Sequence, residues 1–181
     1  MFQDFAILAS IATNPSHPFA LLDRLNTMGV RAKRSTLYRR VDALVEDGFL
    51  ASHVEPGSRG HARRALELTP AGRGQLAGSI EQLLANEALE SPMFTLALGC
   101  AELASPEELT AILRERMSAA ARTLTDEERR LASDDEIEGT WTTAARERRI
   151  AHLKADVAWL QSVLRKRNAR PGSASRGRAT G

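Results

Sequence analysis

The sequence predicts a mainly α-helical protein with one small β-hairpin. Three observations lead to this fold class. Apolar residues recur at helical spacing over most of the chain, the period changes near residue 50 to two short alternating segments, and the turn-rich "PGSRG" separates those segments. The hydrophobic content of 43% and the charged content of 27% are those of a globular protein with a buried core.

Three helices are expected before the hairpin. The first covers residues 2–13 and ends at the prolines of "NPSHP". The second covers residues 18–28, and Gly29 suits a left-handed stop. The third has Ser35 as its N-cap and Gly48 as its terminator. Its buried face is expected to hold Leu37, Val41, Leu44 and Val45.

The hairpin is expected to consist of "FLASHVE" and "ARRALELT". A fourth helix follows, with Thr69 as its N-cap and Pro70 at its first helical position. Its apolar face is expected to hold Leu76, Ile80, Leu83 and Leu84. Three helices, a hairpin and a further helix, in this order, predict a winged helix-turn-helix domain.

Beyond this domain the pattern is helical throughout. "MFTLALGCAEL" predicts a short apolar helix, and the capping box "SPEE" opens a longer one. "TDEE" is either a second helix start or an exposed turn of the same helix. The last helix, about 136–166, carries a coiled-coil-like apolar stripe that we expect to form a dimer interface. The stripe consists of Ile150, Leu153, Val157, Leu160 and Leu164.

Three regions are therefore expected along the chain. Residues 1–88 form the winged helix-turn-helix domain, and residues 89–167 form an α-helical dimerisation and effector region. Residues 168–181 form a disordered basic tail, because they are rich in Gly, Ser and Arg and lack large apolar residues.

Charge is unevenly distributed over the chain. Residues 1–74 carry 10 basic and 7 acidic side chains, residues 75–164 carry 9 and 16, and residues 165–181 carry 6 and none. The division is sharpest in the third helix, where residues 31–40 hold five basic side chains without an acid and residues 41–50 hold three acids without a base. Basic ends of this kind favour a polyanionic partner.

Insertion of a recognition helix into the major groove accounts for this charge division. The N-terminal turns of such a helix enter the groove, where basic and small polar side chains meet phosphates and base edges. The side chains expected to bind DNA there are Lys33, Arg34, Ser35, Thr36, Arg39 and Arg40. Around the hairpin tip, salt-dependent phosphate contacts are expected from Arg59, His61, Arg63 and Arg64. The charges alone are equally compatible with solvated surface.

Three short motifs stand in register in the first half of the chain. They are Thr36-Leu37-Tyr38, the segment "EDGFL" at residues 46–50 and the segment "LTPAGR" at residues 68–73. They resemble the recognition-helix start, the helix exit and the restart after the wing in the PadR family of bacterial transcription regulators. The resemblance in sequence covers residues 1–85, and beyond them it is one of helical architecture.

The resemblance implies a homodimeric repressor that binds a palindromic operator in double-stranded DNA. Release by a small, commonly aromatic, effector is implied as well. By the same analogy Tyr38 contacts DNA, although its place on the helical wheel equally allows packing at the edge of the core. Trp159 is a possible effector contact, with packing in the dimer interface as the alternative. A winged-helix module that binds a protein partner and no DNA is the alternative from another class.

The sequence carries no signature of an enzyme. The four histidines, at positions 17, 53, 61 and 152, lack metal-ligand spacing, and no phosphate-binding loop or nucleophile elbow appears. We therefore expect no catalytic residue, no cofactor and no metal. The single cysteine, Cys100, permits no intramolecular disulfide, and no segment reaches the length of a membrane span. A cytoplasmic location is expected.

Overall fold

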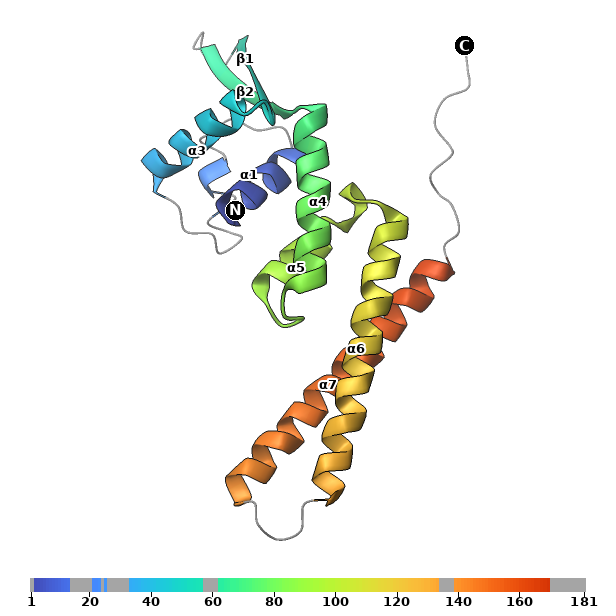
Figure 1. The fold of residues 1–181 in the computed structure, drawn as a ribbon. Helices are drawn as coiled ribbons and strands as arrows, with labels where there is room; N and C mark the ends of the chain where they lie inside the picture. Colours follow the sequence, from blue (N-terminus) through green and yellow to red (C-terminus); the bar gives the residue numbers. More distant parts are fainter. Residues whose placement is uncertain are drawn as a thin grey trace. The chain divides into compact units, whose positions relative to one another are not determined.

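The structure, a computed structural model, has two compact units. It describes residues 2–13, 21–23, 25, 33–56, 62–133 and 139–169. The first unit comprises residues 1–86 and 92–105, and the second comprises residues 87–91 and 106–181. Helices dominate both units, and the two strands pair as one antiparallel hairpin, which confirms the predicted fold class (Figure 1).

The first unit has the predicted order of elements. It contains α1 (Phe2–Thr13), α3 (Arg34–Glu46), β1 (Leu50–Pro56), β2 (Ala62–Leu68), α4 (Pro70–Asn86), α5 (Pro92–Gly99) and the 3₁₀ turn η2 (Ala101–Leu103). The described part of the predicted second helix, residues 21–23 and 25, is helical, and the rest of that prediction lies outside the described residues. In the hairpin, Leu50 pairs with Leu68 and Pro56 with Ala62.

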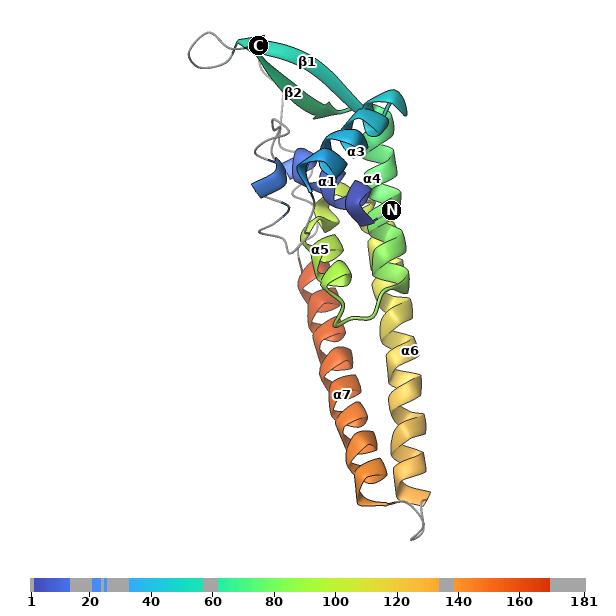
Figure 2. The ribbon, with the colours of Figure 1, turned by 90° about the vertical axis from the view of Figure 1, so that its left-hand side faces the viewer.

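The core of the first unit lies between α1, α3, α4 and β2. Figure 2 shows α1 beside α3, and the two helices are in contact. Helix α1 also contacts α4 and β2, and α3 also contacts β1. The largest fully buried side chains of these elements are Ile7, Leu8, Leu37, Leu66, Leu76, Ile80 and Leu84. Because burial of one such side chain stabilises a fold by about 1.5–3 kcal/mol, this cluster is the main source of stability of the unit. Helix α5 packs on α4 and adds the buried Phe94.

The end of α3 and the start of α4 are joined by four residues that we call the clasp: Gly48, Phe49, Thr69 and Gly72. The hydroxyl Oγ1 of Thr69 lies 2.7 Å from the carbonyl oxygen of Gly48 and accepts a 2.9 Å hydrogen bond from the N–H of Gly72. The N–H of Thr69 donates to the carbonyl oxygen of Phe49 at 3.1 Å. Gly48 ends α3 with φ of 75°, a left-handed conformation that favours glycine. The predicted cap at Thr69 and stop at Gly48 are confirmed.

Gly72 is required by the closeness of two backbone segments. A Cβ atom at this position would lie 2.0 Å from the carbonyl oxygen of Phe49. No side-chain rotation relieves such a contact, since both partners are fixed by the backbone. The first turn of α4 therefore approaches the α3–β1 connection at a distance that only glycine permits.

The predicted N-cap of α3 is wrong by two residues. The first helical hydrogen bond runs from the N–H of Leu37 to the carbonyl of Lys33 at 3.0 Å, so the cap position falls at Lys33 and the helix begins at Arg34. Lys33 has extended backbone angles and supplies no side-chain cap. Ser35 lies inside the first turn, where its intrinsic cap preference, about 1 kcal/mol, is not used.

The second unit is built on two long antiparallel helices, α6 (Pro106–Ser133) and α7 (Thr140–Asn168), which lie side by side in both views (Figures 1 and 2). Helix α6 begins directly after the serine of "SPEE" and continues through "TDEE", which is thus a turn of the same helix. The predicted start of the last helix near residue 136 and the tail beyond residue 169 lie outside the described residues. Within the described ranges, no helix has both the length and the apolar character of a membrane span.

Polar links hold α6 and α7 together at both ends. Glu127 of α6 is buried, and its carboxylate lies 3.4 Å from Nε of Arg149 and 3.9 Å from Nε of Arg146 on α7. Near the other end, a guanidinium nitrogen of Arg167 donates to the carbonyl oxygen of Pro106. A buried carboxylate requires cationic partners of this kind, and the two arginines of α7 compensate the charge of Glu127.

Substitution of Gly72 by Ala tests the clasp. We expect Gly72→Ala to lower the free energy of unfolding by about 1–3 kcal/mol, because the added methyl group overlaps the Phe49 carbonyl. Gly74→Ala is the matched control, since nothing lies within 4 Å of a Cβ there and alanine favours a helix by about 0.5–1 kcal/mol. Urea unfolding followed by circular dichroism compares the two, and equal stability would contradict the role of the clasp.

Candidate nucleic-acid interface

Helix α3 is anchored by one face and exposes the other. Leu37, Val41 and Leu44 are 2%, 0% and 4% exposed, whereas Val45, predicted on the same face, is half-buried. The side chains on the outer face and at the helix start are exposed, apart from the half-buried Thr36. The exposed ones are Lys33, Arg34, Ser35, Tyr38 and Arg39. The structure therefore brings most of the predicted DNA-binding residues to one accessible helix start.

Arg40 is the exception, because an intramolecular ion pair binds its guanidinium. Its Nε donates to Oδ1 of Asp4 at 2.7 Å, and its Nη2 donates to Oδ2 of the same carboxylate. This fork-on-carboxylate geometry is the strong form of an ion pair. Burial acts to raise the pKa of Asp4, but the hydrogen bonds and charges of Arg40 and of the amino terminus together outweigh it and hold that pKa below its ordinary value. Arg40 thus joins α3 to α1 in the structure.

Arg64 of β2 makes a second link, between the hairpin and α3. Its Nη1 lies 2.6 Å from Oδ1 of Asp42, and its Nε donates to Oγ of Ser52 on β1 at 2.8 Å. Asp42 belongs to the acidic half of α3, and its side chain is half exposed. One acid of that half therefore binds a wing arginine. Sequence reasoning missed this pair, because the two residues are 22 positions apart and no local pattern connects them.

The other predicted wing contacts are only partly placed. Arg59 and His61 lie outside the described residues, and Arg63 is in β2 with Glu55 as its register partner. On the wing, Nε2 of His53 lies 2.9 Å from a carboxylate oxygen of Glu55 and 4.0 Å from one of Glu67. The hairpin thus carries acids as well as the bases that the sequence analysis singled out.

The apolar stripe of α7 is largely buried within the single chain. Ile150, Leu160 and Leu164 are 7%, 0% and 7% exposed, and the remaining members Leu153 and Val157 are half-buried. Trp159, the possible effector contact, is 36% exposed. Among the described residues, no group of three or more His, Cys, Asp or Glu side chains is arranged to hold a metal ion.

An exposed basic helix start, anchored on a three-helix core and linked to a two-stranded wing, defines a winged helix-turn-helix domain of the DNA-binding class. Residues 7–78 match the family model described as "Transcriptional regulator PadR-like family", and this segment contains all three motifs and the residues of the clasp. The winged helix-turn-helix domain of this chain belongs to the PadR-like family of transcriptional regulators. That family is not one of enzymes.

Solved structures with a similar fold include two of Bacillus subtilis PadR, one in complex with operator DNA and one in complex with p-coumaric acid. Both are 17% identical to this chain. The match to the DNA complex covers 90% of this chain and 96% of the PadR chain, with a TM-score of 0.40. The match to the p-coumaric acid complex covers 91% of this chain and 98% of the PadR chain, with a TM-score of 0.36. A PadR-like transcriptional regulator from Bacillus cereus is 11% identical, covers 92% of this chain and 98% of its own, and has a TM-score of 0.40. No curated protein matches the chain. Likenesses at this level carry no functional conclusion.

The Asp4–Arg40 pair predicts a pH-dependent contribution to stability. At neutral pH, Asp4→Asn should lower the free energy of unfolding by about 1 kcal/mol, a modest value because the Arg40 side chain is 40% exposed and solvent screens the pair. Because the folded pKa of Asp4 is lowered, this contribution exists above the ordinary carboxyl pKa and is lost as the pH falls through the lowered one. Unfolding curves of both proteins should therefore converge as the pH falls through the lowered pKa of Asp4.

Asp126→Asn is the control for this measurement. Its partner Arg129 lies 2.9 Å away, but the two side chains are 58% and 70% exposed. Exposed pairs contribute less than about 0.5 kcal/mol in helices, so this variant should differ little from the wild type at any pH. A loss at Asp4 that stays constant down to low pH would show that the ion pair is not its cause.

Proposed function

We propose that this PadR-like transcriptional regulator is a homodimeric repressor that binds a palindromic operator and is released by a small effector. One observation carries the proposal: the basic start of α3 is exposed on a winged helix-turn-helix domain, while the apolar face of the same helix is buried. This arrangement supports insertion of the N-terminal turns of α3 into the major groove. We place the protein in the bacterial cytoplasm, where such a DNA site is accessible.

The charged residues divide into two groups in this proposal. Arg39 reads base edges or phosphates together with the neighbouring Lys33, Arg34, Ser35, Thr36 and Tyr38, all of which lie on the exposed start or flank of the helix. Arg40 and Arg64 act mainly through their ion pairs, since contact with a phosphate requires them to share or leave Asp4 and Asp42. Arg59, His61 and Arg63 contribute phosphate contacts from the wing.

Dimerisation is proposed on geometric grounds. Two recognition helices reach successive major grooves when they are about 34 Å apart, which requires two copies related by a two-fold axis. Helix α7 is the proposed pairing helix, with Leu153 and Val157 at the accessible edge of its stripe. Trp141 and Trp159, which are 87% and 36% exposed, are 18 residues apart and therefore share one face of the helix.

Charge reversal at Arg39 tests DNA binding. We expect Arg39→Glu to weaken binding to the DNA upstream of the protein's own gene by at least about tenfold and to reduce the salt dependence of binding. Arg122→Glu makes the same charge change at an exposed position of α6 and should bind like the wild type. Gel shifts at two salt concentrations give both quantities. A wild-type protein that shifts no DNA would support the protein-interaction alternative instead.

Sizing in solution tests the dimer. Light scattering coupled to size exclusion should give twice the mass of one chain, and Trp159→Glu should shift the equilibrium towards the monomer without loss of helical content. Gln161→Glu is the control, because it is exposed and lies about 160° around the same helix. Leu160 is unsuitable for this test, since it is 0% exposed within one chain and its substitution would disturb folding. A wild-type mass of a single chain would contradict the proposal.

A further inference from the structure

Arg64 lies where the buried face of the wing ends. Successive residues of a strand point to opposite faces, so Arg64 shares a face of β2 with the fully buried Leu66 and lies one step further from the core. Its register partner on β1, Val54, is 74% exposed. The arginine therefore stands at the solvent edge of the wing, within hydrogen-bond distance of Asp42 on the recognition helix.

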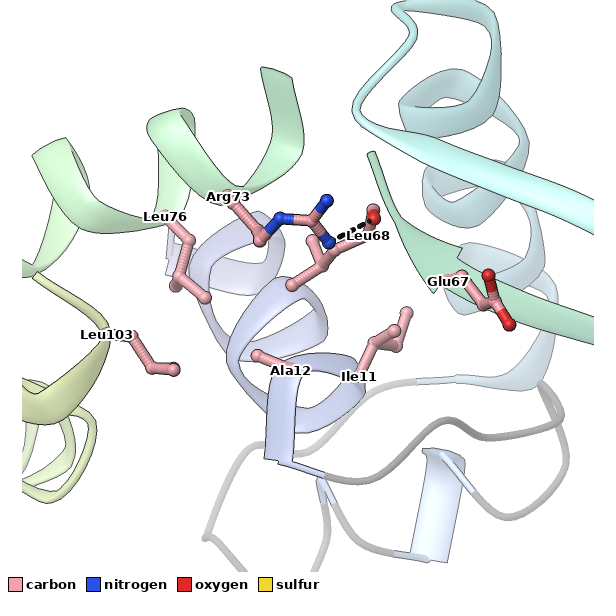
Figure 3. A pocket seen from close by; sticks show the side chains of 7 residues that line it. All are labelled: Ile11, Ala12, Glu67, Leu68, Arg73, Leu76 and Leu103. Carbon is pink, nitrogen blue, oxygen red and sulfur yellow. Dashed lines mark hydrogen bonds between the residues drawn. The ribbon is translucent and has the colours of Figure 1, made fainter. Parts of the chain in front are cut away.

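The described acids of the wing lie on its other face. Glu67 is an odd number of positions from the wing arginine, and Figure 3 shows its side chain pointing away from that of Leu68. Carboxylate oxygens of Glu67 and Glu55 lie 4.0 Å and 2.9 Å from Nε2 of His53. The carboxylate that binds the wing arginine accordingly comes from α3, and it is that of Asp42.

Two bonds from different elements orient the guanidinium of Arg64. Its Nη1 donates to Oδ1 of Asp42 at 2.6 Å, and its Nε donates to Oγ of Ser52 at 2.8 Å. Ser52 is neutral, whereas Asp42 compensates the charge of the guanidinium. The side chains of Arg64 and Asp42 are 35% and 52% exposed, so a DNA phosphate can compete for this arginine. A cation that already has a carboxylate partner gains less from a phosphate than a cation without one.

Two other charged residues of α3 provide the comparison. Arg39 and Glu46 are exposed, and neither forms an ion pair within the ranges that the structure describes. Glu46 lies one turn beyond Asp42 and carries the same charge. An acid on this part of the helix is therefore not bound to the wing simply because it is there. Asp42 is distinguished from Glu46 by its partner Arg64.

We propose that Asp42 is a specificity-determining residue, which withholds Arg64 from phosphates and so lowers the affinity for unrelated DNA more than that for the operator. This inference rests on the proposed function. Unrelated DNA is bound through its phosphates in many registers, and a released cation meets a phosphate in most of them. Base contacts of α3 fix a single register on the operator, where release of the arginine helps only if a phosphate lies within its reach. Specificity is a difference between two affinities, so it rises when the unwanted one is weakened.

Fluorescence anisotropy of the full chain with two labelled duplexes tests the role of Asp42. One duplex is the DNA upstream of the protein's own gene, and the other is a shuffled sequence of equal length and composition. Asp42→Asn should bind the shuffled duplex about threefold or more tightly, with a salt slope steeper by about 0.9, the value for one phosphate. Binding to the upstream duplex should change less, so the ratio of the two affinities falls. An unchanged ratio, or weaker binding to the shuffled duplex, would overturn the proposal.

Two further variants separate pairing from charge and from folding. Glu46→Gln removes the same charge from the same helix and should leave the ratio of affinities nearly unchanged. In an Arg64→Gln background, Asp42→Asn should change the ratio no more than Glu46→Gln does, because there is no arginine left to release. A full effect of Asp42→Asn in that background would show that the carboxylate repels phosphates by itself, and would reject the proposal. Loss of folded protein lowers both affinities by the same factor and does not alter the ratio.

The wild-type protein distinguishes a failure of this inference from a failure of the proposed function. If it prefers the upstream duplex and the preference is the same in Asp42→Asn, the role of Asp42 alone is overturned and the repressor proposal stands. If it binds neither duplex, or binds both with equal affinity, there is no specificity for Asp42 to determine, and both proposals are overturned.

Discussion

The contact of Thr69 with the α3–β1 connection sets the geometry on which the rest of the first unit depends. Gly48 ends α3 and Leu50 begins β1, while Leu68 ends β2 and Pro70 begins α4, so four elements change direction within one small volume. Thr69 bonds to both carbonyls of the connection and caps α4 with the same hydroxyl. These backbone contacts hold the end of the recognition helix against the root of the wing, and the Arg64–Asp42 pair adds a side-chain link between the two elements.

This contact gives two of the PadR-like motifs a common physical cause. "EDGFL" supplies the left-handed glycine and the two carbonyls, and "LTPAGR" supplies the threonine and the glycine that fits against Phe49. Each motif read alone is an ordinary helix stop or helix start. Read together they describe the two sides of one contact, in which Gly48 and Gly72 are needed for different reasons: a positive φ in the first case and a lack of space in the second.

Features that depend on a few neighbouring residues could be predicted from the sequence, whereas pairs of residues far apart in the chain could not. The hairpin, Gly48 and Thr69 follow from preferences that act over a few residues, so their signals are visible in the sequence. Asp4 and Arg40 are 36 residues apart, and their pairing depends on how α1 crosses α3. The cap expected at Ser35 failed because a local preference of about 1 kcal/mol is small beside the packing that places Leu37. The periodicity of the α7 stripe predicts a dimer interface, whereas Ile150, Leu160 and Leu164 are already buried within one chain. A periodic pattern identifies an apolar face of a helix and not the element that covers it.

The division of charge in α3 has a more specific cause than groove insertion alone. Asp4 and Asp42 each hold one arginine close to the recognition helix, and these links order side chains that would otherwise lose conformational freedom when DNA binds. An arginine held in this way gives up part of its phosphate affinity, because DNA must compete with a carboxylate that is already in place. Arg39 lies on the outer, exposed face of α3. The net contribution of a cation to DNA affinity is therefore expected to be larger at Arg39 than at Arg40, although the two are neighbours in the chain.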